Sequence, residues 1–355
     1  MALKLQTAEQ QMTDNVLVKH YAGSIAYGTN LPTSDVDYRG IFCANPVHVR
    51  TPFFPMHEVT DTSEEDTKSF ELCKFMKLAL DCNPNVIETL WVDLSDVVTS
   101  TPEYDMLRMR AGHLLSSKIA FTTSGYALSQ LKRIKGHHKW INQPQPAEAP
   151  QQVDYVSLVH NFTPNKVFKV DLREYYEGHR LVPFSGDTYG MYETPGYRTF
   201  NSETGTLNTD YEGDTHNLGT PKFVVKFNRA NYENMRDTWK NYWTWKNNRN
   251  AARGTLEEQF GYDTKHAMHC VRLLRMGAEA LEQGVILVKR PDAQELLDIR
   301  AGKWTYEELV EYAEHMENHV RHVLLKTTHL PPKPNVKLAA ELTLSIQNSV
   351  WERTK

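Results

Sequence analysis

Apolar and polar residues alternate along the first part of the chain in a way that predicts short strands separated by turns. The stretch 16–22 is rich in aromatic and aliphatic residues and ends at Gly23-Ser24, which indicates a strand followed by a turn. Residues 35–44 alternate apolar and polar side chains, the pattern of a half-buried strand. A third extended stretch at 66–70 leads into a helical pattern, so we expect a small sheet with helices in this part.

The rest of the chain is predicted to be mainly helical, with one long interruption. An amphipathic helix is expected at 120–134, followed at 143–150 by a proline-rich stretch that cannot lie inside a helix. Residues 153–221 show little periodicity and many Gly, Thr, Asn and Tyr residues, which predicts an irregular insertion with short strands. Helical patterning returns near residue 232 and again at 255–283, 305–325 and 337–351. The expected fold class is therefore α+β, with a small mixed β-sheet domain, an irregular insertion and a mainly helical C-terminal domain.

Composition narrows the class of protein. Hydrophobic residues make up 40% of the chain and charged residues 24%, which argues against global disorder. The net charge of -4 and the pI near 6.4 argue against a protein that coats nucleic acid non-specifically. Four scattered cysteines without a Cys-x-x-Cys pair favour reduced thiols. Since the sequence shows neither a signal peptide nor a membrane-spanning apolar run, we expect a cytoplasmic protein without membrane contact.

Two aspartates and a glycine-serine turn are the candidate chemistry of the predicted sheet. Asp35 and Asp37 are two residues apart on one predicted strand, so their carboxylates should point the same way. Convergent carboxylates suit Mg²⁺, and a pair of such ions stabilises the charge that develops when a nucleotide α-phosphorus is attacked. Gly23 and Ser24 lie at a strand-to-helix turn, where backbone N–H groups and a hydroxyl can bind phosphate. Asp-x-Asp alone is usually a solvated edge, and only the combination points to nucleotidyl transfer.

The segment from Gly23 to Gly40, GSIAYGTNLPTSDVDYRG, resembles the active-site motif of the polymerase-β-like nucleotidyltransferase superfamily. It is most similar to the predicted nucleotidyltransferases called RNA-ligase-associated, or RlaP-like. Further blocks of the chain resemble the same group: 70–75, 83–88, 261–275 and 289–291. The resemblance implies that Gly23 and Ser24 bind the nucleotide phosphates and that Asp35 and Asp37 hold the metal ions. The full expected nucleotide-binding set is Gly23, Ser24, Tyr27, Gly28, Ser34, Arg39, Lys265, His269 and Arg272.

The third catalytic carboxylate has two candidates. Superfamily members place it on a strand beside the Asp-x-Asp strand, and here Asp66 and Glu71 compete. In a regular strand, residues five apart face opposite sides, so both cannot reach the same ions. We favour Asp66 as the third metal ligand because Glu71 precedes a strong helical pattern and can be an N-terminal helix charge.

Basic residues suggest further contacts, each with a structural alternative. Lys265, His269 and Arg272 fall on one helix face, with His266 and Arg275 alongside, and would either face phosphate or form a solvated surface. The cluster 132–140 combines residues that pair with phosphate and stack on bases, but it equally suits a basic helix C-terminus. The aromatic group at 239–245 is assigned to packing. The spacing of His266, His269 and Cys270 matches no known zinc pattern.

The sequence therefore predicts a two-metal nucleotidyltransferase that uses Mg²⁺, with Mn²⁺ as the alternative, and a nucleoside triphosphate as substrate. It would transfer a nucleoside monophosphate to an acceptor hydroxyl and release pyrophosphate. RNA, such as a tRNA end, is the expected acceptor, and a protein, a small molecule or a non-catalytic regulatory role are the alternatives. The expected organisation is a catalytic domain at 1–110, a helical connection at 111–145, an irregular insertion at 146–230 and a helical domain at 231–355.

Overall fold

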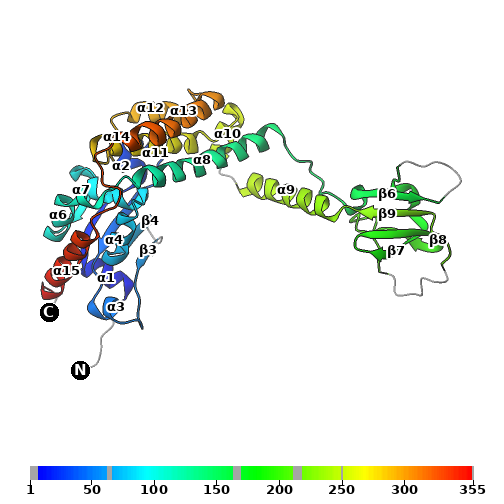
Figure 1. Ribbon diagram of the computed structural model, residues 1–355, viewed down its shortest axis with the longest axis horizontal. Helices are drawn as coiled ribbons and strands as arrows, with labels where there is room; N and C mark the ends of the chain where they lie inside the picture. The colour runs from blue at the N-terminus through cyan, green and yellow to red at the C-terminus, as the bar shows by residue number, and fades with distance from the viewer. Residues whose placement is uncertain (1–6, 62–65, 163–168, 211–217, 249–250, 354–355) are drawn as a thin grey trace. The chain divides into compact units, whose positions relative to one another are not determined.

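The chain forms two compact units. In the computed structural model, which describes residues 7–61, 66–162, 169–210, 218–248 and 251–353, unit 1 contains Met1–Ile141 and Ala252–Lys355. Unit 2 is the intervening segment, Asn142–Ala251 (Figure 1). Unit 1 holds a mixed sheet followed by mostly helical sequence, which confirms the predicted fold class.

A five-stranded sheet lies at the centre of unit 1. Its strands are arranged in the order β3-β4-β2-β1-β5. β2 pairs antiparallel with β1 and parallel with β4, so the segments predicted to carry the acidic residues are direct neighbours. The strand bounds are β1 Val16–Tyr21, β2 Asp37–Phe42, β3 Glu58–Asp61, β4 Asp66–Glu71 and β5 Val97–Ser100.

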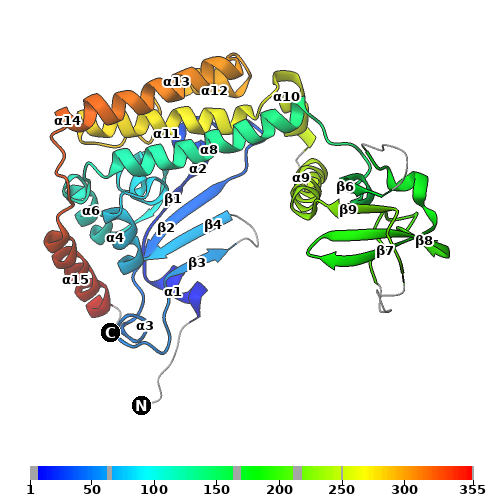
Figure 2. The ribbon, with the colours of Figure 1, turned by 45° about the vertical axis from the view of Figure 1, so that its right-hand side comes forward.

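Three long helices, α8 (Ile119–Asn142), α11 (Thr264–Gln283) and α13 (Tyr306–His319), lie side by side in unit 1 (Figure 2). A Cβ atom at Gly277 of α11 would overlap the hydroxyl of Thr123 on α8, so glycine allows these two helices to approach closely. One hydrophobic core joins the sheet to helices from both ends of the chain, which explains why the two segments form one unit.

The remaining helices of unit 1 are mostly short. The sequence predicted one helix at 255–283, but the structure divides it, because Gly261 has a φ of 78° and Asp263 caps α11 by accepting a hydrogen bond from His266 N. None of the helices described is long and apolar enough to cross a membrane. The bounds are α1 Ala8–Asp14, α2 Gly23–Tyr27, α3 Pro46–Arg50, α4 Leu72–Leu80, α5 Pro84–Ile87, α6 Pro102–Met109, α7 Ala111–Leu114, α10 Ala251–Phe260, α12 Ala293–Arg300, α14 Leu325–Thr327 and α15 Val336–Arg353.

Unit 2 contains a four-stranded antiparallel sheet in the order β6-β9-β8-β7. The sequence predicted short irregular strands here, whereas β8 spans 11 residues. Register shifts within the β6–β9 and β7–β8 pairs interrupt the alternation, so the period of two is hard to read from the sequence. The bounds are β6 Val156–Asn161, β7 Glu177–Ser185, β8 Thr188–Arg198 and β9 Phe223–Phe227.

Helix α9 (Arg229–Asn248) also belongs to unit 2, although the sequence assigned residues from 231 onward to a helical domain. Its first turns pack on the sheet, where the rings of Tyr232 and Phe227 lie 5.7 Å apart. Trp239 and Trp243 both donate hydrogen bonds from Nε1 to the carbonyl of Pro146. These indoles therefore fasten the proline-rich stretch to the helix, a structural role.

Candidate active site

The turn after β1 brings the chain against the Asp37 carboxylate. The backbone N–H of Ala22 donates to the carbonyl of Asp37 at 2.8 Å, which joins the turn to the start of β2. Gly23 follows with a φ of 58°, and a Cβ atom at this position would overlap Asp37 Oδ2. Both the left-handed backbone and the lack of space require glycine here. The sequence correctly anticipated a small-residue turn that faces an acidic strand.

The loop between the turn and β2 shapes the approach to the aspartates. Gly28 ends α2 with a φ of 73°, and the carbonyl of Ser24 accepts a hydrogen bond from Thr29 N at 2.8 Å. Ser34 Oγ accepts a hydrogen bond from Leu31 N at 2.8 Å, so its hydroxyl stabilises the loop immediately before Asp35. Ser34 thus has a structural partner, although the sequence predicted nucleotide contact.

Two carboxylates lie side by side on adjacent strands. Asp37 and Asp66 are the first residues of β2 and β4, and the parallel register pairs them directly. Side chains at paired positions of neighbouring strands point to the same face of a sheet. The prediction that Asp35 shares a strand with Asp37 is wrong, because β2 begins at Asp37 and the exposed Asp35 lies two residues before it, in the preceding loop. Asp66 therefore occupies the neighbouring-strand position expected of a third carboxylate.

Glu71 lies at the opposite end of β4. It pairs with Phe42, is 3% exposed and forms the N-cap of α4, where its carboxylate accepts hydrogen bonds from Cys73 N and Lys74 N. Burial raises the pKa of this carboxyl group above its usual value, and the two backbone hydrogen bonds lower it. The structure thus gives Glu71 the helix-capping position that was its structural alternative.

The electrostatics of Asp37 reveal its charged neighbours. Burial raises the pKa of the Asp37 carboxyl above its usual value, and the negative charges of Asp66 and Asp35 raise it further. The positive charges of Arg39 and Lys265 lower it. Mutual repulsion of this kind is relieved by a bound cation, and the oxygen donors suit Mg²⁺ or Mn²⁺.

The aspartates are spaced more widely than a closed metal site. Over the part of the chain that the structure describes, one group of three His, Cys, Asp or Glu residues has ligand atoms that all lie within 4.8 Å of one another. That group is His137, Glu257 and Asp263, near the start of α11, and the aspartates of β2 and β4 do not form a second one. Metal binding by the aspartates would therefore draw their oxygens closer together.

Residues 1–145 match the model of the family RlaP, described as RNA repair pathway DNA polymerase beta family. This confirms the RlaP-like resemblance inferred from the Gly23–Gly40 motif for this part of the chain, and the family description suggests a polymerase-β-like nucleotidyltransferase. The RlaP match includes all of the unit 1 sheet and α8, whereas α11 and the sheet of unit 2 lie outside it. No curated protein and no solved structure matches the chain.

Tyr27 and Arg272, predicted to bind nucleotide, are buried next to the turn after β1. The Tyr27 hydroxyl donates to Glu88 Oε1 at 2.8 Å, and the guanidinium of Arg272 lies 3.7 Å from the centroid of the Tyr27 ring. Arg272 Nη1 is 3.6 Å from Glu88 Oε2. Burial raises the pKa of both Tyr27 and Glu88 above their usual values. These side chains therefore support the turn from below, a role that the sequence did not reveal for Glu88.

Not every residue of the predicted basic stripe of α11 carries a positive charge near pH 7. Burial lowers the pKa of His269 to about 3, and Arg272 and Lys265 lower it in the same direction, so His269 is neutral near pH 7. His266 hydrogen-bonds Asp263 at 2.5 Å, and Arg275 Nη1 donates to Asp292 at 2.6 Å. Lys265 is the stripe residue whose charge acts on Asp37. The stripe prediction thus retains Lys265 as its phosphate-facing candidate.

The segment that follows α11 also contacts the turn after β1. Lys289 Nζ donates to Asp96 at 3.0 Å and to the carbonyl of Ile25 at 3.4 Å. The backbone N–H of Arg290 donates to the carbonyl of Tyr27 at 3.1 Å. The sequence marked 289–291 only as a block that resembles the family, because contacts between segments so far apart leave no local pattern.

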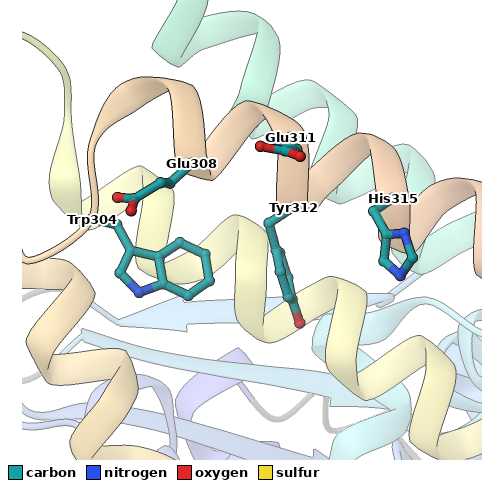
Figure 3. Close-up of a pocket in the computed structure, with 5 residues that line it drawn as sticks. All are labelled: Trp304, Glu308, Glu311, Tyr312 and His315. Carbon is teal, nitrogen blue, oxygen red and sulfur yellow. The ribbon is translucent and has the colours of Figure 1, made fainter.

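A pocket of about 380 Å³ lies on α13, lined by two aromatic rings, two glutamates and a histidine (Figure 3). The rings of Trp304 and Tyr312 are 5.1 Å apart, and Arg275 Nε donates to the Tyr312 hydroxyl at 2.9 Å. The glutamates give this pocket the wrong charge for a triphosphate. None of the predicted site residues lines it.

Proposed function

We propose that unit 1 transfers a nucleoside monophosphate from a nucleoside triphosphate to a hydroxyl of RNA, with release of pyrophosphate. The observation that carries this proposal is the pairing of Asp37 with Asp66 on parallel strands, with the Gly23 backbone directly against Asp37. This arrangement gathers hard oxygen ligands beside a turn that a polyphosphate can approach closely. The RNA acceptor is supported by the RNA repair description of the matching family.

The described residues divide into three roles in this proposal. Asp35, Asp37 and Asp66 would hold two Mg²⁺ ions, which when bound assist deprotonation of the acceptor hydroxyl and neutralise the leaving pyrophosphate. The backbone of Gly23 and Ser24 would bind the triphosphate. Arg39 and Lys265 would offset its negative charge, since both already act on Asp37.

The network below the turn would keep the triphosphate site in place. Tyr27, Glu88 and Arg272 are buried and linked to one another, and Lys289 and Arg290 hold the backbone of α2 from the other side. Positioning to within a fraction of an ångström contributes much of the rate in phosphoryl and nucleotidyl transfer.

The test is magnesium-dependent pyrophosphate release from each of the four triphosphates with an RNA acceptor. Asp37→Asn and Asp66→Asn should each lower the rate by about 1000-fold or more, because each removes a charge worth several kcal/mol to the transition state. Asp81→Asn is the matched control, since Asp81 is an exposed aspartate of unit 1 that pairs with Lys118. Wild-type activity in the Asp37→Asn variant would end the proposal.

The acceptor is tested in the same reaction with a labelled triphosphate. Label that appears in RNA supports the proposal, whereas label that appears only in protein or in a small molecule keeps the chemistry and overturns the acceptor.

A further inference from the structure

The two faces of the unit 2 sheet differ in their surroundings. One face belongs to the core of the unit and includes Met191. Successive residues of a strand point to opposite faces, so the next position, Gly190, lies on the other face. The pairing register extends that position into one row across all four strands: Val182, Gly190, Val224 and His160.

Aromatic rings fill the space above Gly190. A Cβ atom there would come within 2.8 Å of Tyr192 Cε2 and 2.9 Å of Phe184 Cε1, so both rings lie over the glycine on this face. Tyr192 is 7% exposed, whereas Phe184 remains 49% exposed. Tyr192 thus forms the floor, and Phe184 offers a supported apolar ring to solvent.

Basic side chains and further exposed aromatic rings lie around Tyr192 and Phe184. Arg180 pairs in register with Tyr192, and its guanidinium lies 3.6 Å from the centroid of Tyr197, which is 50% exposed. Lys226 is exposed and pairs with Thr188. At the β6 edge, the rings of His160 and Phe162 lie 4.3 Å apart.

The charge of this face is of one sign. Three rows of paired residues cross this face: one contains Arg180 and Tyr192, the next contains Gly190, and the third contains Thr188 and Lys226. The described residues of these rows are basic, aromatic, small or aliphatic, and none is acidic. An anionic partner with flat apolar groups complements such a surface. Exposed bases and phosphates together have this chemistry.

We propose that this face of unit 2 binds single-stranded RNA, with bases stacked on Phe184 and Tyr197 and phosphates paired with Arg180 and Lys226. The inference rests on the proposed RNA acceptor and adds a binding surface that lies outside the family match. A surface of exposed rings and cations should bind a single strand in preference to a duplex. The bases of a duplex are already stacked on one another and cannot stack on the protein's rings.

The experiment measures fluorescence anisotropy of a labelled single-stranded RNA with the full chain and without triphosphate. Phe184→Ala should weaken binding by about ten-fold, as expected for loss of one base stack, and Phe184→Trp should restore it. Phe53→Ala is the matched control, because Phe53 is a 78% exposed phenylalanine of unit 1. Unchanged thermal unfolding of the Phe184 variants would show that the fold is intact.

Two further measurements separate this inference from the proposed function. The Asp37→Asn variant should bind the RNA as tightly as the wild type, and the Phe184→Ala variant should bind the triphosphate as tightly as the wild type. RNA binding and triphosphate binding can therefore be lost separately. Equal binding by wild type and Phe184→Ala would overturn the inference, and so would equal competition by unlabelled duplex RNA.

Discussion

The two sheets arrange their functional side chains in opposite ways. In unit 1, Asp37 and Asp66 are gathered at one register position, where burial and like charge raise the pKa of Asp37. In unit 2, the exposed Phe184 lies on the same face as the half-buried Arg180 and the exposed Lys226, with no acidic residue paired to either in the strand register. The first arrangement concentrates like charge, whereas the second places cations beside an aromatic ring.

The ion pairs that support the two sheets differ in the same sense. The Arg272 and Glu88 side chains are 5% and 7% exposed, and they lie directly below the turn that faces Asp37. In unit 2, Arg229 pairs with Asp187 while 51% and 28% exposed. The pair below the turn that faces Asp37 is thus buried, whereas the pair of unit 2 is solvated.

Breaking the buried support should give the largest loss of stability. Arg272→Met leaves the Glu88 carboxylate buried without its cation, which should lower the free energy of unfolding by about 3–5 kcal/mol in denaturant titrations. Arg229→Met, the matched change in unit 2, should cost about 1 kcal/mol or less because its pair is solvated. If both variants lost the same free energy of unfolding, burial of the ion pair would not distinguish the two sheets.

The next largest effect is expected for a substitution in the turn at Gly23, and it should appear in the rate of nucleotidyl transfer. Gly23→Ala adds a Cβ atom that overlaps the Asp37 carboxylate and also strains a residue with φ of 58°, so nucleotidyl transfer should fall by about 100-fold. Gly28→Ala is the control, since its φ is 73° but the nearest neighbour of an added Cβ is 3.8 Å away. If both variants lose activity equally, backbone strain alone accounts for the loss and the overlap with Asp37 is irrelevant.

A smaller effect is expected at the far end of β4. Glu71→Gln removes the capping carboxylate of α4 and should lower the free energy of unfolding by about 1 kcal/mol. Transfer should stay within a few-fold of wild type, in contrast to Asp66→Asn, which changes a carboxylate on the same strand. Loss of transfer in Glu71→Gln without loss of stability would instead make Glu71 the third catalytic carboxylate.

Local patterns predicted the centre of the candidate site better than its surroundings. The Gly23 turn and the Asp37 strand could be read from the sequence because both depend on residues close together in the chain. The choice between Asp66 and Glu71 could only be argued, since it depends on the register between β2 and β4. Helical spacing placed Lys265 and Arg272 on one face of α11, but not which of them is buried.

The sheet of unit 2 was harder to predict for a related reason. Register shifts near His160 and His179 displace the alternation that identifies strands. The space above Gly190 is filled by Phe184 of the neighbouring β7 and by Tyr192 of its own strand. The exposed rings were visible in the sequence only as scattered aromatics. Their position on one face required the pairing of three strands.

The smallest predicted effect tests the cations of unit 2. Lys226→Gln should reduce the slope of log K against log salt for single-stranded RNA by about 0.7, the value for loss of one phosphate contact, while affinity at low salt falls only a few-fold. Lys240→Gln, on exposed α9 rather than on the sheet, should leave the slope unchanged. A slope that falls equally in both variants would mean that RNA is attracted by the general charge of the unit. A slope that falls only for Lys226→Gln, together with weaker binding by Phe184→Ala, would assign phosphate and base contacts to the same face, which is the arrangement that distinguishes this sheet from the acidic one of unit 1.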